Sequence, residues 1–315
     1  MDPKYIYLIV ALTILIIYLT ISYFIYKKIF LMKGNRQYSV VNQEDPFFNP
    51  SWKWYEKVPK ETVKIKAYDN TILKGVYIPS IDEKSLNTAI ILHGYHSVST
   101  DMVLVAKTYS DLGFKVLLPD LRGHGLSEGI FTSFGHYEKY DLKRWINFVL
   151  RTYGSTDSIL LDGVSMGAST VMLASTLQLP ENVKFIVADS GFPSMNEVFI
   201  KSFKPKIGLL FLPGVSLITY YFHHFFLGQI KPIHEVRKSK IPIFFIHGTQ
   251  DELIPFDMAK KLYATSKSPF KELYSVENAK HALGYKDDKA GIDARLKEIL
   301  PDFFDIKKSF LKQTK

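Results

Sequence analysis

The distribution of apolar and polar residues divides the chain into a long apolar segment near its start and a later region of alternating short and long apolar runs. From Tyr5 to Tyr26 no charged residue occurs, and Ile, Leu, Val, Tyr and Thr dominate. As a helix this segment would be about 33 Å long, enough to cross the roughly 30 Å hydrocarbon core of a bilayer. It lacks the polar stripe of a helix that packs on a soluble domain. The pattern therefore predicts a membrane anchor over residues 1–30.

A cleaved signal peptide and a buried helix are the alternatives to an anchor. No small-residue cleavage site follows the segment, which leads directly into Lys27 and Lys28. We therefore expect an uncleaved, single-pass anchor in the cell membrane, in contact with membrane lipid. The positive charges after the span favour a main domain on the cytoplasmic side, although the side is left open.

Residues 31–60 show no strong periodicity and contain three prolines among several aromatic residues. We expect this stretch to be a tether. Trp and Tyr favour the membrane interface, so the tether could lie there. Packing on the globular domain is the alternative, and the sequence leaves both open.

Residues 61–315 have the pattern of a single α/β domain. Two β-rich runs flank Asp69 and Asn70 and predict an antiparallel hairpin. The later runs are continuous and rich in Val, Ile, Leu and Phe, as in parallel strands buried on both faces. The expected strands are 61–68, 71–79, 88–92, 115–118, 158–162, 185–188, 243–246 and 272–276. The expected helices are 101–112, 137–153, 166–178, 256–266 and 293–311. This alternation predicts a mostly parallel sheet with helices on both faces.

One interval, at about residues 192–240, breaks the alternation. It includes an apolar stretch at 209–227 that could be a second membrane span, but Pro213, Gly214, His223 and His224 interrupt it. The interval also lies between two strands of one sheet. We therefore expect a helical cap over the carboxyl edge of the sheet.

Composition narrows the chemistry. The chain has no cysteine, so thiolate nucleophiles, disulfides and cysteine zinc sites are excluded. Its net charge of +9 comes from 40 Lys and Arg against 31 Asp and Glu. Much of the local excess lies beside the apolar span, where anionic lipid is a simpler partner than nucleic acid. No nucleic-acid partner is expected.

The candidate nucleophile is Ser165. The expected strand 158–162 runs into Gly163-Val164-Ser165-Met166-Gly167 and then into an expected helix. Gly-x-Ser-x-Gly at a strand-to-helix turn is a nucleophile elbow, which exposes the serine hydroxyl. The pentapeptide alone arises often by chance, and its position between a buried strand and a helix gives it weight.

A serine nucleophile needs a base, and the base needs an acid that orients it. Asp251 follows the strand at 243–246 and His281 follows the strand at 272–276. We expect both at the carboxyl edge of the sheet together with Ser165. Glu252 and Asp189 are the alternative acids.

The remaining histidines receive other interpretations. His93 and His247 each precede a glycine at a strand end and are expected to form loop hydrogen bonds. His223 and His224 are adjacent and lack spaced carboxylates, so no metal site is expected.

For the oxyanion hole we expect the backbone N–H groups of Met166, directly after the nucleophile, and of Tyr95 after Gly94.

Together these motifs resemble the α/β-hydrolase superfamily. They are His93-Gly94, Asp120-Leu121-Arg122-Gly123-His124-Gly125-Leu126-Ser127, Gly163-Val164-Ser165-Met166-Gly167, His247-Gly248-Thr249-Gln250-Asp251 and the late His281. Within that superfamily the chain resembles membrane-anchored bacterial serine hydrolases related to monoacylglycerol lipases and serine aminopeptidases. The resemblance implies an eight-stranded sheet with a cap, hydrolysis without a cofactor, and the triad named above. It also implies that Arg122 and His124 belong to a structural loop.

We expect a serine esterase that cleaves a carboxylic ester with an apolar acyl group through an acyl-enzyme intermediate. A small-molecule ester or a lipid-like molecule is the expected substrate, and the oligomeric state is left open. A peptidase or amidase of the same fold is one alternative, with Glu197 the nearest candidate to bind a substrate amine. A non-catalytic membrane scaffold is the other.

Overall fold

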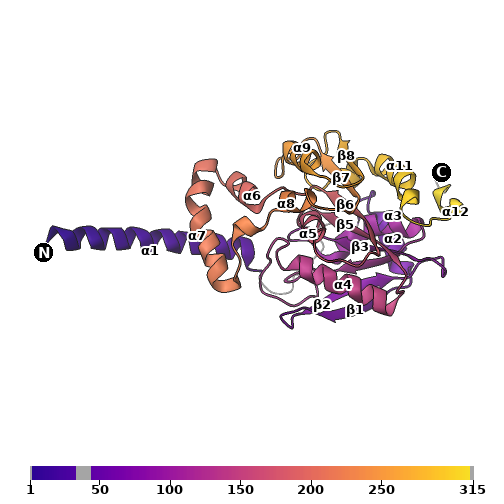
Figure 1. Ribbon diagram of the computed structural model, residues 1–315, viewed down its shortest axis with the longest axis horizontal. Coiled ribbons are helices and arrows are strands. Elements are labelled where there is room, and N and C mark those ends of the chain that lie inside the picture. Colours follow the sequence, from indigo (N-terminus) through magenta and orange to yellow (C-terminus); the bar gives the residue numbers. More distant parts are fainter. Residues whose placement is uncertain (1, 33–43, 313–315) are drawn as a thin grey trace. The chain divides into compact units, whose positions relative to one another are not determined.

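The computed structural model describes residues 2–32 and 44–312, which fall into two compact units (Figure 1). The helical unit comprises Met1–Leu31 and Ser194–Ile230. The sheet unit comprises Met32–Pro193 and Lys231–Lys315. The segment Ser194–Ile230 of the helical unit is therefore the central part of the interval 192–240, which the sequence predicts to be a cap.

The sheet unit is built on eight strands in the order β1-β2-β4-β3-β5-β6-β7-β8. They are β1 (Glu61–Lys66), β2 (Ile72–Ile78), β3 (Asn87–Leu92), β4 (Lys115–Pro119), β5 (Ser158–Val164), β6 (Val183–Asp189), β7 (Ile243–Gly248) and β8 (Lys271–Val276). The pairs β1–β2 and β2–β4 are antiparallel, and the other five pairs are parallel. The prediction of a hairpin that leads into a mostly parallel sheet is confirmed.

Helices cover both faces of this sheet (Figure 1). One face carries α2 (Asn49–Lys57), α3 (Val103–Asp111) and α11 (Lys289–Ile299). The other carries α4 (Glu138–Thr152), α5 (Met166–Ala174), α8 (Pro232–Val236) and α9 (Phe256–Thr265). Every residue of β3 and β7 is buried, which is why the middle of each strand is a continuous apolar run that does not alternate.

The expected tether lies partly outside the described residues, because residues 33–43 are not among them. After this gap, α2 packs on the sheet unit. Tyr55 belongs to the main apolar cluster, and Trp52 and Trp54 pack against it. The aromatic residues of this stretch therefore cover the domain core next to α3.

The last expected helix, 293–311, is shorter and begins earlier in the structure. Helix α11 begins at Lys289 and ends at Ile299, a short 3₁₀ turn follows over Leu300–Asp302, and α12 covers only Lys308–Leu311. Pro301 accounts for the break, because proline has no N–H to donate and its ring crowds the preceding turn.

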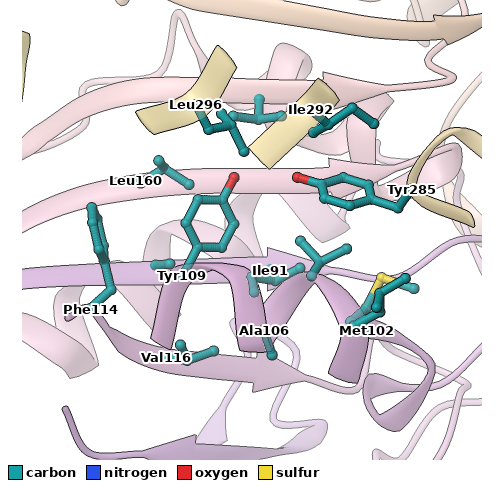
Figure 2. Packing of buried hydrophobic residues seen from close by; sticks show 14 of the residues in the cluster. Ile91, Met102, Ala106, Tyr109, Phe114, Val116, Leu160, Tyr285, Ile292 and Leu296 are labelled. Atoms are coloured by element: carbon teal, nitrogen blue, oxygen red, sulfur yellow. The ribbon is translucent and has the colours of Figure 1, made fainter. Parts of the chain in front are cut away.

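A buried polar group interrupts the main core beneath the sheet. Tyr109 of α3 donates a 2.6 Å hydrogen bond to Asp162 Oδ2 on β5. Figure 2 shows the hydroxyl of Tyr285 facing that of Tyr109 within this apolar cluster. Burial raises the pKa of Asp162 to about 7, even though the bond from Tyr109 favours its charged form. A carboxyl group is thus held in the core three residues before Ser165 in sequence.

The helical unit contains α1 (Pro3–Phe30), α6 (Met195–Ser202), α7 (Pro205–His223) and a 3₁₀ turn, η2 (Leu227–Gln229). Helices α1 and α7 are long and apolar enough to cross a membrane. They pack against each other through the second half of α1. The helix that the sequence predicts near the N-terminus is therefore present, and it packs within its own unit against part of the expected cap.

Candidate active site

Ser165 lies at a tight turn between β5 and α5. Its φ of +56° and ψ of −109° are unusual for a residue with a side chain. The flanking glycines permit the turn. A Cβ on Gly163 would lie 2.3 Å from the carbonyl carbon of Gly167, and one on Gly167 would lie 2.2 Å from the oxygen of Leu92. Ser165 is half-buried, whereas its neighbours from Leu161 to Ala168 are buried.

Two hydrogen bonds join Ser165, His281 and Asp251. Ser165 Oγ lies 2.8 Å from His281 Nε2, and His281 Nδ1 lies 2.7 Å from Asp251 Oδ2. Asp251 follows β7, and His281 follows β8, so each side chain comes from a loop at the carboxyl end of a parallel strand. The structure thus brings together the three residues that the sequence singles out.

The carboxylate of Asp251 is fully buried and has partners for both oxygens. Oδ1 accepts hydrogen bonds from the backbone N–H groups of Leu253 and Ile254, at 3.0 and 2.7 Å. Oδ2 lies 3.3 Å from His247 Nε2 in addition to its bond with His281. Burial alone would raise the pKa of Asp251, but the hydrogen bonds from the two histidines outweigh burial and lower it to about 2. Asp251 is therefore ionised at neutral pH.

The two alternative acids occupy different environments. Glu252 is exposed, whereas the carboxylate in contact with His281 is that of Asp251. Asp189, at the end of β6, is buried, and its Oδ1 accepts a 2.8 Å hydrogen bond from the hydroxyl of Ser190. Burial raises the pKa of Asp189 to about 6.

The loop after β3 lies beside the nucleophile. A Cβ on Gly94 would lie 3.4 Å from Ser165 Cβ, so Gly94 leaves space next to the serine. Tyr95 follows directly, with its ring 4.9 Å from that of Phe134. Met166 is the first residue of α5, and N–H groups in a first helical turn have no acceptor within the helix. Both residues expected to form the oxyanion hole are therefore in elements next to Ser165.

Sequence reasoning missed a connection through Ser190. Its hydroxyl accepts a 3.2 Å hydrogen bond from the backbone N–H of Ala282, next to His281. In addition, the carbonyl of Asp189 accepts a 2.7 Å bond from the backbone N–H of Ser165. The only sequence signal for this connection is a polar Asp-Ser pair directly after a buried strand.

His93 and His247 form loop hydrogen bonds, as predicted. His93 Nε2 accepts a bond from Leu121 N–H, and its Nδ1 donates to the carbonyl of Gly94. Burial lowers the pKa of His93 to about 4, so the ring is neutral at neutral pH. His247 lies 2.7 Å from the carbonyl of Ile254. Its second contact, with Asp251, is a role that the sequence did not indicate.

The hydrogen bonds of Arg122 have a structural role. Its guanidinium binds both carboxylate oxygens of Asp141, at 2.7 and 2.8 Å, and Asp69 Oδ2 at 2.9 Å. It thereby ties the loop after β4 to α4 and to the β1–β2 turn.

As for metals, residues 2–32 and 44–312 contain no cluster of three His, Asp or Glu placed to hold an ion.

Known proteins are similar to this chain in sequence and in fold. A family model described as "Serine aminopeptidase, S33" matches residues 83–212. The uncharacterized protein YqkD of Bacillus subtilis (strain 168) is 26% identical over 280 residues, which are 88% of this chain and 91% of YqkD. The esterase Pf2001 of Pyrococcus furiosus aligns with a TM-score of 0.65 at 24% identity, over 85% of this chain and 100% of that one. The chain has the α/β-hydrolase fold.

A second solved structure shares the α/β-hydrolase fold. Est1E of Butyrivibrio proteoclasticus, solved with ferulic acid bound, aligns with a TM-score of 0.60 at 20% identity, over 76% of this chain and 98% of Est1E. At such identities the likeness to Pf2001 and Est1E shows the fold. Together with the family model, these neighbours support an esterase-like hydrolytic enzyme.

Proposed function

We propose that this α/β hydrolase is a serine esterase that cleaves a carboxylic ester with an apolar acyl group. The observation that carries the proposal is the continuous hydrogen-bonded series Ser165–His281–Asp251. An ionised Asp251 accepts a hydrogen bond from the Nδ1–H of His281, which leaves Nε2 unprotonated and able to accept the proton of the serine hydroxyl. A serine with a correctly oriented base is what acyl transfer to an enzyme requires.

In the proposed reaction Ser165 Oγ attacks the ester carbonyl carbon while His281 Nε2 takes the hydroxyl proton. The resulting oxyanion accepts hydrogen bonds from the N–H groups of Met166 and Tyr95. His281 then returns the proton to the alkoxide, so an alcohol leaves and the acyl group remains on Ser165. Water attacks the acyl carbonyl carbon next while His281 takes its proton, and His281 then returns this proton to Ser165 Oγ as the carboxylic acid is released. Asp251 stays ionised throughout and stabilises the imidazolium.

The apolar acyl group is inferred from the chain inserted between β6 and β7. Residues 207–222 of this insertion carry no charge and are mainly Leu, Ile, Phe and Tyr. An apolar surface of this kind favours a substrate that partitions into the membrane, where each acyl methylene transferred from water gains about 0.8 kcal/mol. The neighbours named as esterases support an ester rather than an amide substrate.

The test uses the full-length protein in detergent. A fluorophosphonate probe should label the native chain and not Ser165→Ala, and this substitution should lower turnover of p-nitrophenyl esters by a factor on the order of 10⁶. Activity should rise from acetate to octanoate esters. Labelling of Ser165→Ala, or no labelling of the native chain, would refute the mechanism. A sharp optimum at acetate would refute the apolar acyl group alone.

A peptidase is the second candidate, because the family model that matches residues 83–212 is described as a serine aminopeptidase. It shares the triad and differs in the leaving group. Aminoacyl p-nitroanilides assayed beside the p-nitrophenyl esters separate the two functions. Efficient cleavage of the anilides with little cleavage of the esters would favour the peptidase.

We also propose that α1 is a membrane anchor. Only 6% of its most apolar 18-residue stretch is buried, and its large apolar side chains from Tyr5 to Ile17 are exposed. Such a surface is stable in hydrocarbon and unstable in water. The full-length chain should remain with the membrane fraction after alkaline carbonate washing, and release into the supernatant would contradict the anchor.

A further inference from the structure

Helix α7 also has an exposed apolar surface, although it is more buried than α1. Seven large side chains between residues 207 and 222 are each 45–75% exposed. They are Ile207, Leu209, Leu210, Leu217, Tyr220, Tyr221 and Phe222. These side chains gather toward the two ends of one helix, and exposed apolar groups of this kind mark a surface that contacts another phase or molecule.

The rest of α7 packs closely on its own unit through small residues. A Cβ on Gly208 would lie 2.7 Å from Ile200 Cα of α6, and one on Gly214 would lie 2.3 Å from Ser22 Oγ of α1. Glycines that bring helix backbones together are typical of helix packing in membranes. Rings add to the contact, since Tyr26 stacks on Phe222 with centroids 5.6 Å apart.

The polar groups of this packed region are satisfied from within the helical unit. The hydroxyl of Tyr18 donates to the carbonyl of Leu210 at 3.0 Å and accepts from the N–H of Gly214 at 2.9 Å. Both backbone groups lie next to Pro213 in α7. Ser22 donates to the carbonyl of Tyr18. Internal satisfaction of backbone groups is the condition for a segment in contact with lipid.

The position of α7 along α1 matches one membrane interface. From Pro3 to Ser22 the helix rises about 30 Å, the thickness of the hydrocarbon core. Ser22 is also where Gly214 makes its closest approach. Lys27 and Lys28 follow within two turns, and the exposed Lys204 and Lys206 flank the start of α7. Lysines and tyrosines at this depth are typical of an interface.

We infer that α7 is itself seated in the bilayer, with its exposed apolar side chains in the lipid at the interface beside α1. The inference rests on the proposed anchoring by α1. According to this inference, the anchor α1 and the inserted helix α7 form one lipid-bound unit. The occupant of the α7 surface is lipid, because this surface continues that of α1 and carries lysine at its end.

The absence of cysteine from the chain allows a direct test. Tyr221→Cys is labelled with an environment-sensitive fluorophore in the full-length protein, reconstituted in phosphatidylcholine vesicles with a minority of phosphatidylglycerol. Ile14→Cys reports on the anchor, and Ile81→Cys, 80% exposed in the sheet unit, is the matched aqueous control. Leu217→Cys repeats the α7 measurement if Tyr221→Cys folds poorly, as judged by fluorophosphonate labelling.

The label at position 221 should be quenched by lipids with a doxyl group near the headgroup, and iodide should quench it several-fold less than the label at 81. Equal behaviour of the labels at 221 and 81 would overturn the inference. Protection from iodide without quenching by lipid would also overturn it, because it would indicate a protein partner or second copy on α7. Failure of the label at 14 to be quenched by doxyl groups deep in the bilayer would instead refute the anchor.

Discussion

Ser190 Oγ accepts a 3.2 Å hydrogen bond from the backbone N–H of Ala282, the residue directly after His281. Ala282 has a φ of +57°, a conformation that costs energy for a residue with a side chain and needs support from its surroundings. The same hydroxyl donates to Asp189 Oδ1 at 2.8 Å. The end of β6 thus holds the backbone beside the imidazole of His281 and, through the carbonyl of Asp189, the N–H of Ser165.

Ser190→Ala should therefore lower kcat about tenfold and leave KM nearly unchanged, since the loss of one hydrogen bond of about 1–1.5 kcal/mol corresponds to such a factor. Steady-state kinetics on a p-nitrophenyl ester measures the change, and the rate of fluorophosphonate labelling should fall in parallel. Ser268→Ala is the matched control, because its buried hydroxyl bonds the carbonyl of Ile241 at the opposite end of the strands. Equal losses in both variants would show a general effect on stability.

Asp251→Asn and Asp189→Asn distinguish the acid of the triad from its buried neighbour. The amide that replaces the carboxylate in Asp251→Asn could not accept the Nδ1 proton as a carboxylate does, so kcat should fall by about 10⁴, as in other triads. Asp189→Asn keeps an acceptor for Ser190 and should cost less than about tenfold. Kinetics from pH 6 to 9 give both values. A larger loss for Asp189→Asn would reassign the acid.

The fold and the positions of the candidate triad could be predicted because their causes are local in sequence. Most of the strands in the middle of the sheet contain continuous apolar runs, and Gly163 and Gly167 flank Ser165 within five residues. Asp251 and His281 lie in the loops that follow β7 and β8. The carboxyl ends of parallel strands meet at one edge, so order along the chain was enough to bring these residues together.

The supporting contacts could not be predicted because they join distant segments through groups without a distinctive pattern. Ser190 and Ala282 are 92 positions apart, and Tyr18 and Gly214 are 196 apart. A serine after a strand or a tyrosine in an apolar helix is compatible with many environments. Which one it occupies depends on how α1 packs on α7, and periodicity carries no information on that.

Asp162→Asn should change the dependence of stability on pH. Burial raises the pKa of Asp162 from 3.8 to about 7 in the folded chain. A raised pKa contributes stability that is present below pH 4 and is lost as pH rises through 7. The free energy of unfolding of the native chain should therefore fall, relative to the Asn variant, by a few kcal/mol between pH 4 and 8, at about 1.4 kcal/mol per pKa unit.

Urea unfolding at pH 5 and 8 measures this difference, and the Asn side chain keeps an oxygen to accept the hydrogen bond from Tyr109. Asp257→Asn is the control, because that carboxylate is 88% exposed and should show no such difference. A native chain that gains stability over Asp162→Asn as pH rises would contradict the neutral state of Asp162.

Tyr18→Phe should loosen α7 without removing the anchor. The substitution keeps the ring, which stacks on Phe211 with centroids 5.5 Å apart, and removes the hydroxyl that bridges Leu210 and Gly214. The substitution removes two hydrogen bonds between α1 and α7, each of about 0.5–1.5 kcal/mol, so amide exchange in the peptides of α7 should accelerate about tenfold. Hydrogen–deuterium exchange on the full-length chain in detergent micelles measures it. Tyr7→Phe, at a site that is 74% exposed, should leave exchange unchanged.

Arg122→Ala should destabilise the fold and spare the chemistry. The guanidinium makes two hydrogen bonds to the buried Asp141, and removal of one partner of such a pair costs about 3–5 kcal/mol. Burial already raises the pKa of Asp141 to about 6 against the opposing effect of Arg122, so without Arg122 the carboxyl should be neutral over a wider range. The loss of stability should therefore be larger at pH 8 than at pH 5.

The structural role of Arg122 predicts that each correctly folded Arg122→Ala molecule keeps its activity. Burst titration of reactive Ser165 counts the folded sites at about 15 °C, and kcat per titrated site should stay within about twofold of the native value, because Arg122 contacts Asp141 and Asp69 and not the reacting groups. Asp141→Ala removes the buried partner of Arg122, leaves its contact with Asp69, and should also lower stability. An Arg122→Ala variant that unfolds like the native chain but has lost kcat would place the guanidinium in the reaction itself.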